Sequence, residues 1–306
     1  MNTQPTASLK RGFTLLELMV AMAITTIIVT VLVSITSIAL DTWNRSRSEL
    51  RASRQAKSML DTMARDFESM VIRKGTTNEW FSAVKAPPIG GDLKSTNAAK
   101  LVFFTGATDR YNGEVGKASV DKGGDVSCVA YSLEYKDPIG TGFATFVLNR
   151  LVVNPDETFT DLLGKPYLLN DPLDGSKVGS FTAAYDTQLS DPGSFTCENI
   201  YQFTVTFQVQ VTDTTQTPPK ITQERVTLGP ATTSLKILGT GFATTPASTG
   251  PLATGRVTSI QISATVISDF GIDQLKKRKF PTPELQADFL AKNSYQYTKQ
   301  IELPSL

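Results

Sequence analysis

The chain has 306 residues, enough for two ordinary domains or one large one, and its net charge is +1. So small a net charge gives no long-range field that would attract nucleic acid or an acidic substrate. The sequence contains no histidine, which removes the commonest general base, the commonest metal ligand and every catalytic triad that uses imidazole. We therefore expect no enzyme, no cofactor and no metal site.

The N-terminal region combines a polar leader with a long apolar run. The leader, residues 1–12, ends in two cations and a glycine, and the apolar run occupies residues 13–40. A run of this length can cross a bilayer core of about 30 Å as a helix. Because it follows the leader, the pattern differs from that of a secretory signal peptide. Glu17 lies inside the run, where a carboxylate without a partner costs about 2 to 4 kcal/mol. The sequence therefore predicts a membrane helix in which Glu17 has a partner.

Residues 12–17, Gly-Phe-Thr-Leu-Leu-Glu, resemble the processing signal of the type IV prepilin family. The resemblance implies that a membrane peptidase, the prepilin peptidase, cuts between Gly12 and Phe13 and then methylates the new amino group of Phe13. It also implies that Glu17 pairs with the N-terminal ammonium of a neighbouring subunit during assembly. The alternative is a signal anchor in which the glutamate is accidental.

The charges around the apolar run and the prepilin resemblance predict opposite orientations. Two cations precede the run, and five follow it: Arg45, Arg47, Arg51, Arg54 and Lys57. Counting basic residues would place the C-terminal side in the cytoplasm. The resemblance implies the reverse, because the peptidase of the family acts at the cytoplasmic face. We follow the more specific signal and expect a single-pass protein of the inner membrane with its C-terminal head in the periplasm.

The helix is expected to continue well beyond the membrane. Residues 41–73 contain no glycine or proline, and apolar side chains recur there at alternating steps of four and three residues. This spacing gives one apolar stripe on a helix, formed by Ala56, Leu60, Met63, Phe67 and Met70. Gly75 follows two cations and is expected to end the helix. The predicted stalk helix thus occupies residues 13–75.

Residues 76–306 change to the period-two pattern of strands and are expected to form a β-rich head. Strands are predicted at residues 101–104, 129–135, 146–153, 201–211, 226–228, 235–238 and 260–266, and a short helix at 283–291. The second and third of these strands are expected to pair across a Pro-Ile-Gly-Thr-Gly turn. Alternation of apolar and polar residues favours antiparallel pairing with one wet face. The predicted fold is α+β and pilin-like, with one long N-terminal helix packed on a mostly antiparallel β head.

Within the prepilin family, the chain is most similar to the J-type minor pseudopilin of type II secretion and to similarly large minor pilins. The similarity lies in Arg65-Asp66-Phe67, in the paired patterns Tyr131-x-Leu133 and Leu148-x-Arg150, and in residues 200–203. It implies a structural subunit at the tip or in the initiation complex of a pseudopilus. The implied partners are other pseudopilins or pilins, the prepilin peptidase and the inner-membrane assembly platform.

Two other functions stay open. The chain could be a type IV minor pilin for adhesion or DNA uptake, which the neighbouring assembly genes would distinguish. It could also be a membrane-tethered periplasmic binding module that does not polymerise.

The two cysteines, Cys128 and Cys197, leave two interpretations open. An oxidising compartment would permit a disulfide between them. Two buried free thiols on separate strands fit the sequence as well.

Several further motifs are expected to be turns or solvated surface. Gly-Thr-Gly-Phe-Ala-Thr occurs at residues 140–145 and again at 239–244, but a phosphate-binding loop needs a helix after it, and none is predicted. Asp109, Asn112 and Glu114 supply oxygen ligands of the kind that calcium prefers, although their spacing favours a polar turn.

Two charged segments are also expected to be a turn and a solvated surface. Asp171 and Asp174 lie in a segment with turn composition. The basic run 276–279 could contact acidic lipid or a partner, and a solvated surface is the favoured interpretation.

Overall fold

The structure is a computed structural model of the chain. It describes residues 14–76, 78–85, 99–106, 124–138, 140, 142, 144–163, 181–213, 217, 219–247, 252 and 255–303. The chain divides into two compact units, Met1–Glu49 and Leu50–Leu306, which we describe separately and call unit 1 and unit 2.

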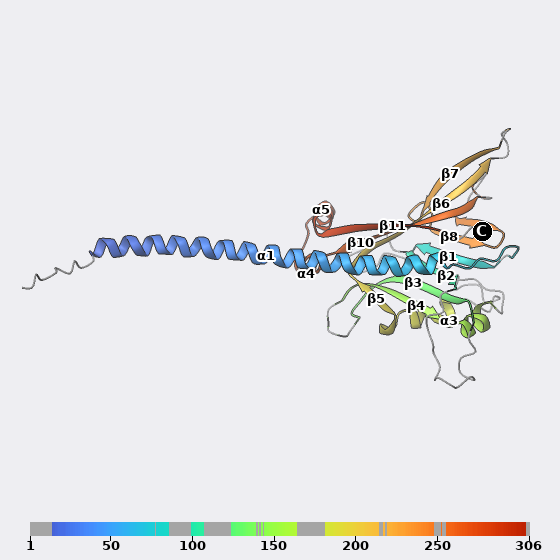
Figure 1. Cartoon of the computed structure of the whole chain (residues 1–306), viewed down its shortest axis with the longest axis horizontal. Coiled ribbons are helices and arrows are strands. Elements are labelled where there is room, and N and C mark those ends of the chain that lie inside the picture. The colour runs from blue at the N-terminus through green and yellow to red at the C-terminus, as the bar shows by residue number, and fades with distance from the viewer. Residues whose placement is uncertain are drawn as a thin grey trace, which may run out of the picture. The chain divides into compact units, whose positions relative to one another are not determined.

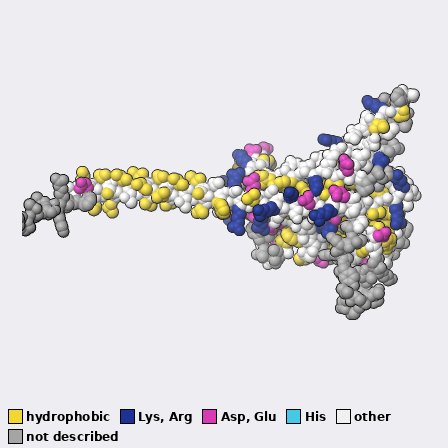
Figure 2. All heavy atoms as spheres, viewed as in Figure 1, with side chains coloured by type: hydrophobic (Ala, Val, Ile, Leu, Met, Phe, Trp, Pro, Cys, Tyr) yellow, Lys and Arg dark blue, Asp and Glu magenta, His cyan; other side chains and the backbone are white. Residues whose placement is uncertain are grey.

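Helix α1 comprises Leu15–Glu68 and contributes to both units. In unit 1 its apolar side chains are exposed, for example 78% of Leu15 and 64% of Ile27. Hydrophobic side chains cover this part of the helix in Figure 2. By length and composition, α1 is the one helix in the described residues that could cross a membrane.

In unit 2 the same helix buries one face. The predicted apolar stripe is confirmed for Ala56, Leu60, Met63 and Phe67, which are buried on α1. Met70 is also buried, but it lies beyond the end of the helix. The expected end at Gly75 is wrong, because α1 ends at Glu68. The chain then joins the sheet instead of continuing the helix: Met70 forms a bridge with Thr105, and the N–H of Val71 donates to the carbonyl of Phe104 at 2.9 Å. Gly75 has φ +80° and lies in the turn that follows.

Eleven antiparallel strands among the described residues of unit 2 form two sheets (Figure 1). The larger sheet has the order β5-β4-β3-β2-β1-β8-β9. Its strands are β1 Glu79–Lys85, β2 Ala99–Thr105, β3 Ser127–Lys136, β4 Thr145–Val153, β5 Phe195–Glu198, β8 Ser234–Leu238 and β9 Gly241–Thr245. The smaller sheet has the order β11-β10-β6-β7. Its strands are β6 Ile200–Asp213, β7 Lys220–Thr227, β10 Arg256–Ile267 and β11 Ser294–Glu302.

Short helices complete unit 2. They are α2 Pro155–Glu157, a π-helical turn Thr158–Leu163, α3 Phe181–Leu189, a 3-10 turn Pro192–Ser194, α4 Asp269–Lys277 and α5 Pro283–Asn293. The predicted helix at residues 283–291 is thereby confirmed as α5. The predicted pairing of residues 129–135 with 146–153 is also confirmed, as β3 and β4.

The main core lies between the C-terminal part of α1 and both sheets. Phe67 of α1 stacks on Phe103 of β2 with ring centroids 4.4 Å apart, and Phe81 of β1 contacts Phe207 of β6 edge-on at 5.4 Å. A second core covers the opposite face of the larger sheet, where Phe181, Tyr185 and Leu189 of α3 pack. The first half of β3 is therefore buried on both faces, whereas its alternating pattern predicts one wet face. The fold is pilin-like α+β, as predicted.

A buried polar cluster ties the last turn of α1 to β3 and β4. The carboxylate of Asp66, which is 2% exposed, accepts hydrogen bonds from Nε of Arg150 at 2.8 Å and from Nη2 at 2.9 Å. The hydroxyl of Tyr131 donates to the same carboxylate. A bidentate guanidinium–carboxylate pair with a further donor satisfies a buried charge and fixes the geometry around it. The cluster thus fixes how α1 packs on the larger sheet within unit 2.

Candidate functional site

The described part of α1 begins with a capping box that holds Glu17. The backbone N–H and the hydroxyl of Thr14 both donate to Oε2 of Glu17 at 2.9 Å, and the N–H of Glu17 donates to Oγ1 of Thr14 at 3.2 Å. This reciprocal arrangement satisfies free N–H groups in the first turn of a helix. A carboxylate there also suits the positive end of the helix dipole. Glu17 therefore has a local partner within its own chain.

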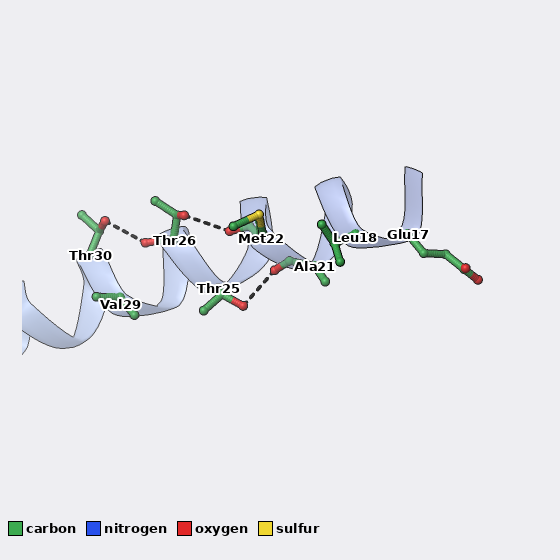
Figure 3. Close-up of a pocket in the computed structure, with 8 residues that line it drawn as sticks. All are labelled: Glu17, Leu18, Ala21, Met22, Thr25, Thr26, Val29 and Thr30. Carbon is green, nitrogen blue, oxygen red and sulfur yellow. Dashed lines mark hydrogen bonds between the residues drawn. The ribbon is translucent and has the colours of Figure 1, made fainter. Parts of the chain in front are cut away.

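The face of α1 that follows Glu17 carries small and β-branched residues. A shallow hollow on this face is lined by Glu17, Leu18, Ala21, Met22, Thr25, Thr26, Val29 and Thr30, whose side chains Figure 3 shows along the helix. A single helix lines the hollow, so it is a groove along the helix surface and not an enclosed cavity. The hydroxyls of Thr25, Thr26 and Thr30 each donate to the carbonyl four residues earlier at 2.8 Å. Since these polar groups are satisfied internally, the face can lie against lipid or another helix.

Several residues of interest lie outside the part of the chain that the structure describes. They are Gly12 and Phe13 of the expected cleavage site, the possible calcium ligands Asp109, Asn112 and Glu114, and the turn residues Asp171 and Asp174. Among the described residues, no group of three or more cysteine or acidic side chains could hold a metal ion.

The repeated Gly-Thr-Gly-Phe-Ala-Thr motif forms a hairpin at its second copy. Gly239 and Thr240 make the turn, and Gly241–Thr245 is strand β9, which pairs with β8. The prediction of a turn is therefore correct for the first two residues only. A Cβ on Gly239 would approach the carbonyl oxygen of Arg73 to 2.4 Å. The glycine thus allows the hairpin to approach the chain after α1.

The two cysteines are free and buried in different places, so the structure contains no bridge between Cys128 and Cys197. They belong to β3 and β5, which flank β4 on its two sides, and they lie opposite Val153 and Leu148 of β4, which are five residues apart. Two strand spacings, about 9 to 10 Å, and an offset of about 16 Å along β4 therefore separate them. Their side chains also point to opposite faces, since Cys197 packs in the main core and Cys128 in the second. A disulfide needs Cα atoms closer than about 7 Å. Of the two interpretations that the sequence leaves open, the structure supports two buried free thiols on separate strands.

The buried thiols are expected to resist thiol reagents until the protein unfolds. Burial raises the pKa of the Cys128 thiol well above its ordinary value and raises that of Cys197 to about 12. Because the thiolate is the reactive form, both side chains should be inert at neutral pH. A chromogenic disulfide reagent should detect no thiol in the native protein and two thiols in denaturant without reductant. Detection of none in denaturant would reveal a disulfide and contradict the structure.

Comparison with known families gives one match. The model of the prokaryotic N-terminal methylation motif matches residues 8–33. The comparisons with curated proteins and with solved structures gave no match. The motif marks a type IV prepilin-like protein. It implies processing by prepilin peptidase and pilus-like assembly, and proteins of this kind are structural rather than catalytic.

The capping role of Thr14 was missed by the sequence reasoning, although a signal for it is present. A threonine followed three residues later by glutamate, directly before an apolar run, is the sequence signature of a capping box. The cluster of Asp66, Tyr131 and Arg150 was also missed as a contact. Each of its three residues falls in a segment that carries the resemblance to minor pseudopilins.

Proposed function

We propose that this protein is a minor pseudopilin, a structural subunit at the tip or in the initiation complex of a type II secretion pseudopilus. The chain is anchored by α1 in the inner membrane, with unit 2 in the periplasm. Prepilin peptidase cuts it between Gly12 and Phe13 and methylates Phe13. The observation that carries the proposal is Glu17, held at the start of an exposed apolar helix inside the matched motif.

The capping box supports a simple assembly mechanism. Both hydrogen bonds from Thr14 go to Oε2 of Glu17, so within the described residues Oε1 remains for a donor from another chain. The N-terminal ammonium of a neighbouring subunit is such a donor, and its charge would compensate the carboxylate in the apolar filament core. The box keeps the carboxylate satisfied while the subunit is alone in the membrane. Pairing with a neighbour then brings in an ammonium whose charge and that of the carboxylate compensate each other.

The intact mass of the protein from its native membrane tests the processing. We expect loss of residues 1–12 and one added methyl group on Phe13, because the matched motif, residues 8–33, covers the end of the leader, the expected cleavage site and the start of the helix. Tandem mass spectrometry of the N-terminal peptide locates the methyl group. A control strain that lacks prepilin peptidase should yield the uncut, unmethylated chain. An uncut chain from cells with active peptidase would refute the proposal and favour a tethered domain.

A further inference from the structure

The basic run 276–279 adjoins aromatic and aliphatic side chains in the structure. Lys276 and Lys277 end α4, Arg278 and Lys279 follow it, and all four residues are exposed. We define the basic–aromatic surface as these four cations with Phe270, Phe280, Leu285 and Phe289. Figure 2 shows Lys and Arg side chains gathered at the end of unit 2 where Figure 1 labels α4 and α5.

Two of the apolar members, Phe280 and Phe289, lie beside each other, and one of them lies beside a cation. The rings of Phe280 and Phe289 lie 5.3 Å apart, and the guanidinium of Arg278 lies 5.9 Å above the ring of Phe289. Phe270 is 49% exposed and Leu285 is 50% exposed. Solvated charge alone does not explain exposed apolar side chains beside a basic run. Cations mixed with aromatic and aliphatic side chains are typical of surfaces that bind the interface of a membrane.

The surface adjoins the part of α1 through which the chain enters unit 2. Arg51 of α1 contacts Asp269, the first residue of α4, at 3.3 Å. The N–H of Ser268, just before α4, donates to the carbonyl of Asn293 at the end of α5 at 3.0 Å. Arg51 follows the apolar run by only eleven residues, which is about 16 Å of helix. The chain that connects the apolar run to this surface is therefore short.

Acidic side chains within α4 and α5 limit the strength of such a contact. Asp269 already pairs with Arg51 and accepts a hydrogen bond from Asn199, and Asp273 pairs with Lys277 at 2.7 Å. Glu284 and Asp288 of α5 also lie on the exposed side of unit 2. The charge balance favours a weak and reversible attraction to an anionic surface. A subunit that must leave the membrane to enter a filament needs a contact of this kind.

We propose that the basic–aromatic surface rests on the anionic lipid headgroups of the membrane that anchors the chain. The cations contact phosphate groups, and the side chains of Phe280, Leu285 and Phe289 reach the interface between headgroups and acyl chains. The contact holds unit 2 at the membrane before assembly. This inference rests on the membrane anchoring in the proposed function, but it does not depend on cleavage, methylation or polymerisation.

The test places an environment-sensitive fluorophore on Leu285→Cys in the full chain, reconstituted in vesicles. The native cysteines are buried, so the label attaches to the new thiol. In phosphatidylcholine vesicles that contain one third phosphatidylglycerol, we expect the emission of the label to shift to the blue. Lipids brominated on the acyl chain should quench this emission. In pure phosphatidylcholine, the shift should be largely lost. Ile221 of β7 is 61% exposed. The same label on Ile221→Cys should show the emission of a water-exposed fluorophore in both kinds of vesicle.

Charge removal provides the matched comparison. Because each cation near an anionic surface strengthens binding about fivefold, replacing Lys276, Lys277, Arg278 and Lys279 by glutamine should abolish the shift. A control variant removes the same number of exposed charges elsewhere in unit 2, at Lys74, Lys220, Arg225 and Arg256, and should keep it. Circular dichroism and melting curves verify that both variants are folded.

Three outcomes would overturn the inference. The label could report water in both vesicles, it could respond equally in both, or it could respond only when other pilin subunits are added. The last outcome would make this a protein-binding surface. The vesicle assay involves no peptidase and no filament, so its failure is distinguishable from failure of the proposed function.

Discussion

Replacing Asp66 by alanine should lower the free energy of unfolding of unit 2 by about 3 to 5 kcal/mol, the cost of leaving a buried charge without its partner. The guanidinium of Arg150 would remain between β4 and α1, and its side chain is only 16% exposed. The hydroxyl of Tyr131 would lose its acceptor as well. Chemical denaturation of the detergent-solubilised chain, followed by circular dichroism, measures the change.

Variants of the two partners separate the cluster from a simple packing defect. Tyr131→Phe removes only a hydroxyl and should cost about 1 to 2 kcal/mol. Asp66→Leu combined with Arg150→Met removes both charges and should be more stable than either single variant, because no buried ion is left without a partner. If the double variant instead loses the sum of the single effects, the two side chains are not coupled and our description of the cluster is wrong.

The pH dependence of stability gives a second readout of the same cluster. Burial, and then the charge of Asp66, raise the pKa of Tyr131 well above its ordinary value of about 10. A group whose pKa is higher in the folded state contributes stability that is complete below its unfolded pKa and is lost as the pH rises. The protein should therefore lose stability above pH 10, and Tyr131→Phe should lose less over that range.

Much of unit 2 could be predicted from local pattern, and the failures have structural causes. Strand β6 alternates without a break because one of its faces is wet, so its period is visible. Strand β1 has no such period, since its first five residues are all buried, and it was missed. The glycine at the start of β9 favours a turn, although the segment is a strand. The sequence pattern does not predict β11, although it pairs with β10 over nine residues.

The end of α1 depended on contacts that no local pattern contains. Arg73, Lys74 and Gly75 are a good helix end by themselves. The helix nevertheless ends at Glu68, because the backbone after it bonds to the end of β2. The cluster around Asp66 could not be predicted for the same reason: Asp66 and Arg150 are 84 residues apart in the sequence. The site at Glu17 was predictable, since all its signals lie within a few residues.

Glu17→Val should abolish incorporation into filaments while leaving membrane insertion intact. Valine suits the apolar helix better than glutamate does, so the anchor itself should be unharmed. The variant lacks the carboxylate that would pair with the N-terminal ammonium of a neighbour, and nothing else in the first turn replaces it. Crosslinking to other pilin subunits in cells and recovery of the chain in sheared filaments measure assembly, and alkali extraction measures insertion.

Two further variants separate the charge of Glu17 from its capping role. Glu17→Gln keeps an oxygen acceptor for the backbone N–H of Thr14 but has no charge, so it should fail to assemble nearly as completely as valine. Thr14→Val keeps the charge and removes the hydroxyl from both of its hydrogen bonds, so assembly should be reduced and not abolished. A capping box stabilises a helix by about 1 kcal/mol. A carboxylate in a filament core that lacks the ammonium of a neighbouring subunit costs about 2 to 4 kcal/mol. Full assembly of Glu17→Val would show that the carboxylate serves only as a helix cap and that the proposed pairing with a neighbour is wrong. If the unaltered chain itself is absent from filaments and crosslinks to no pilin subunit, the chain is a tethered domain.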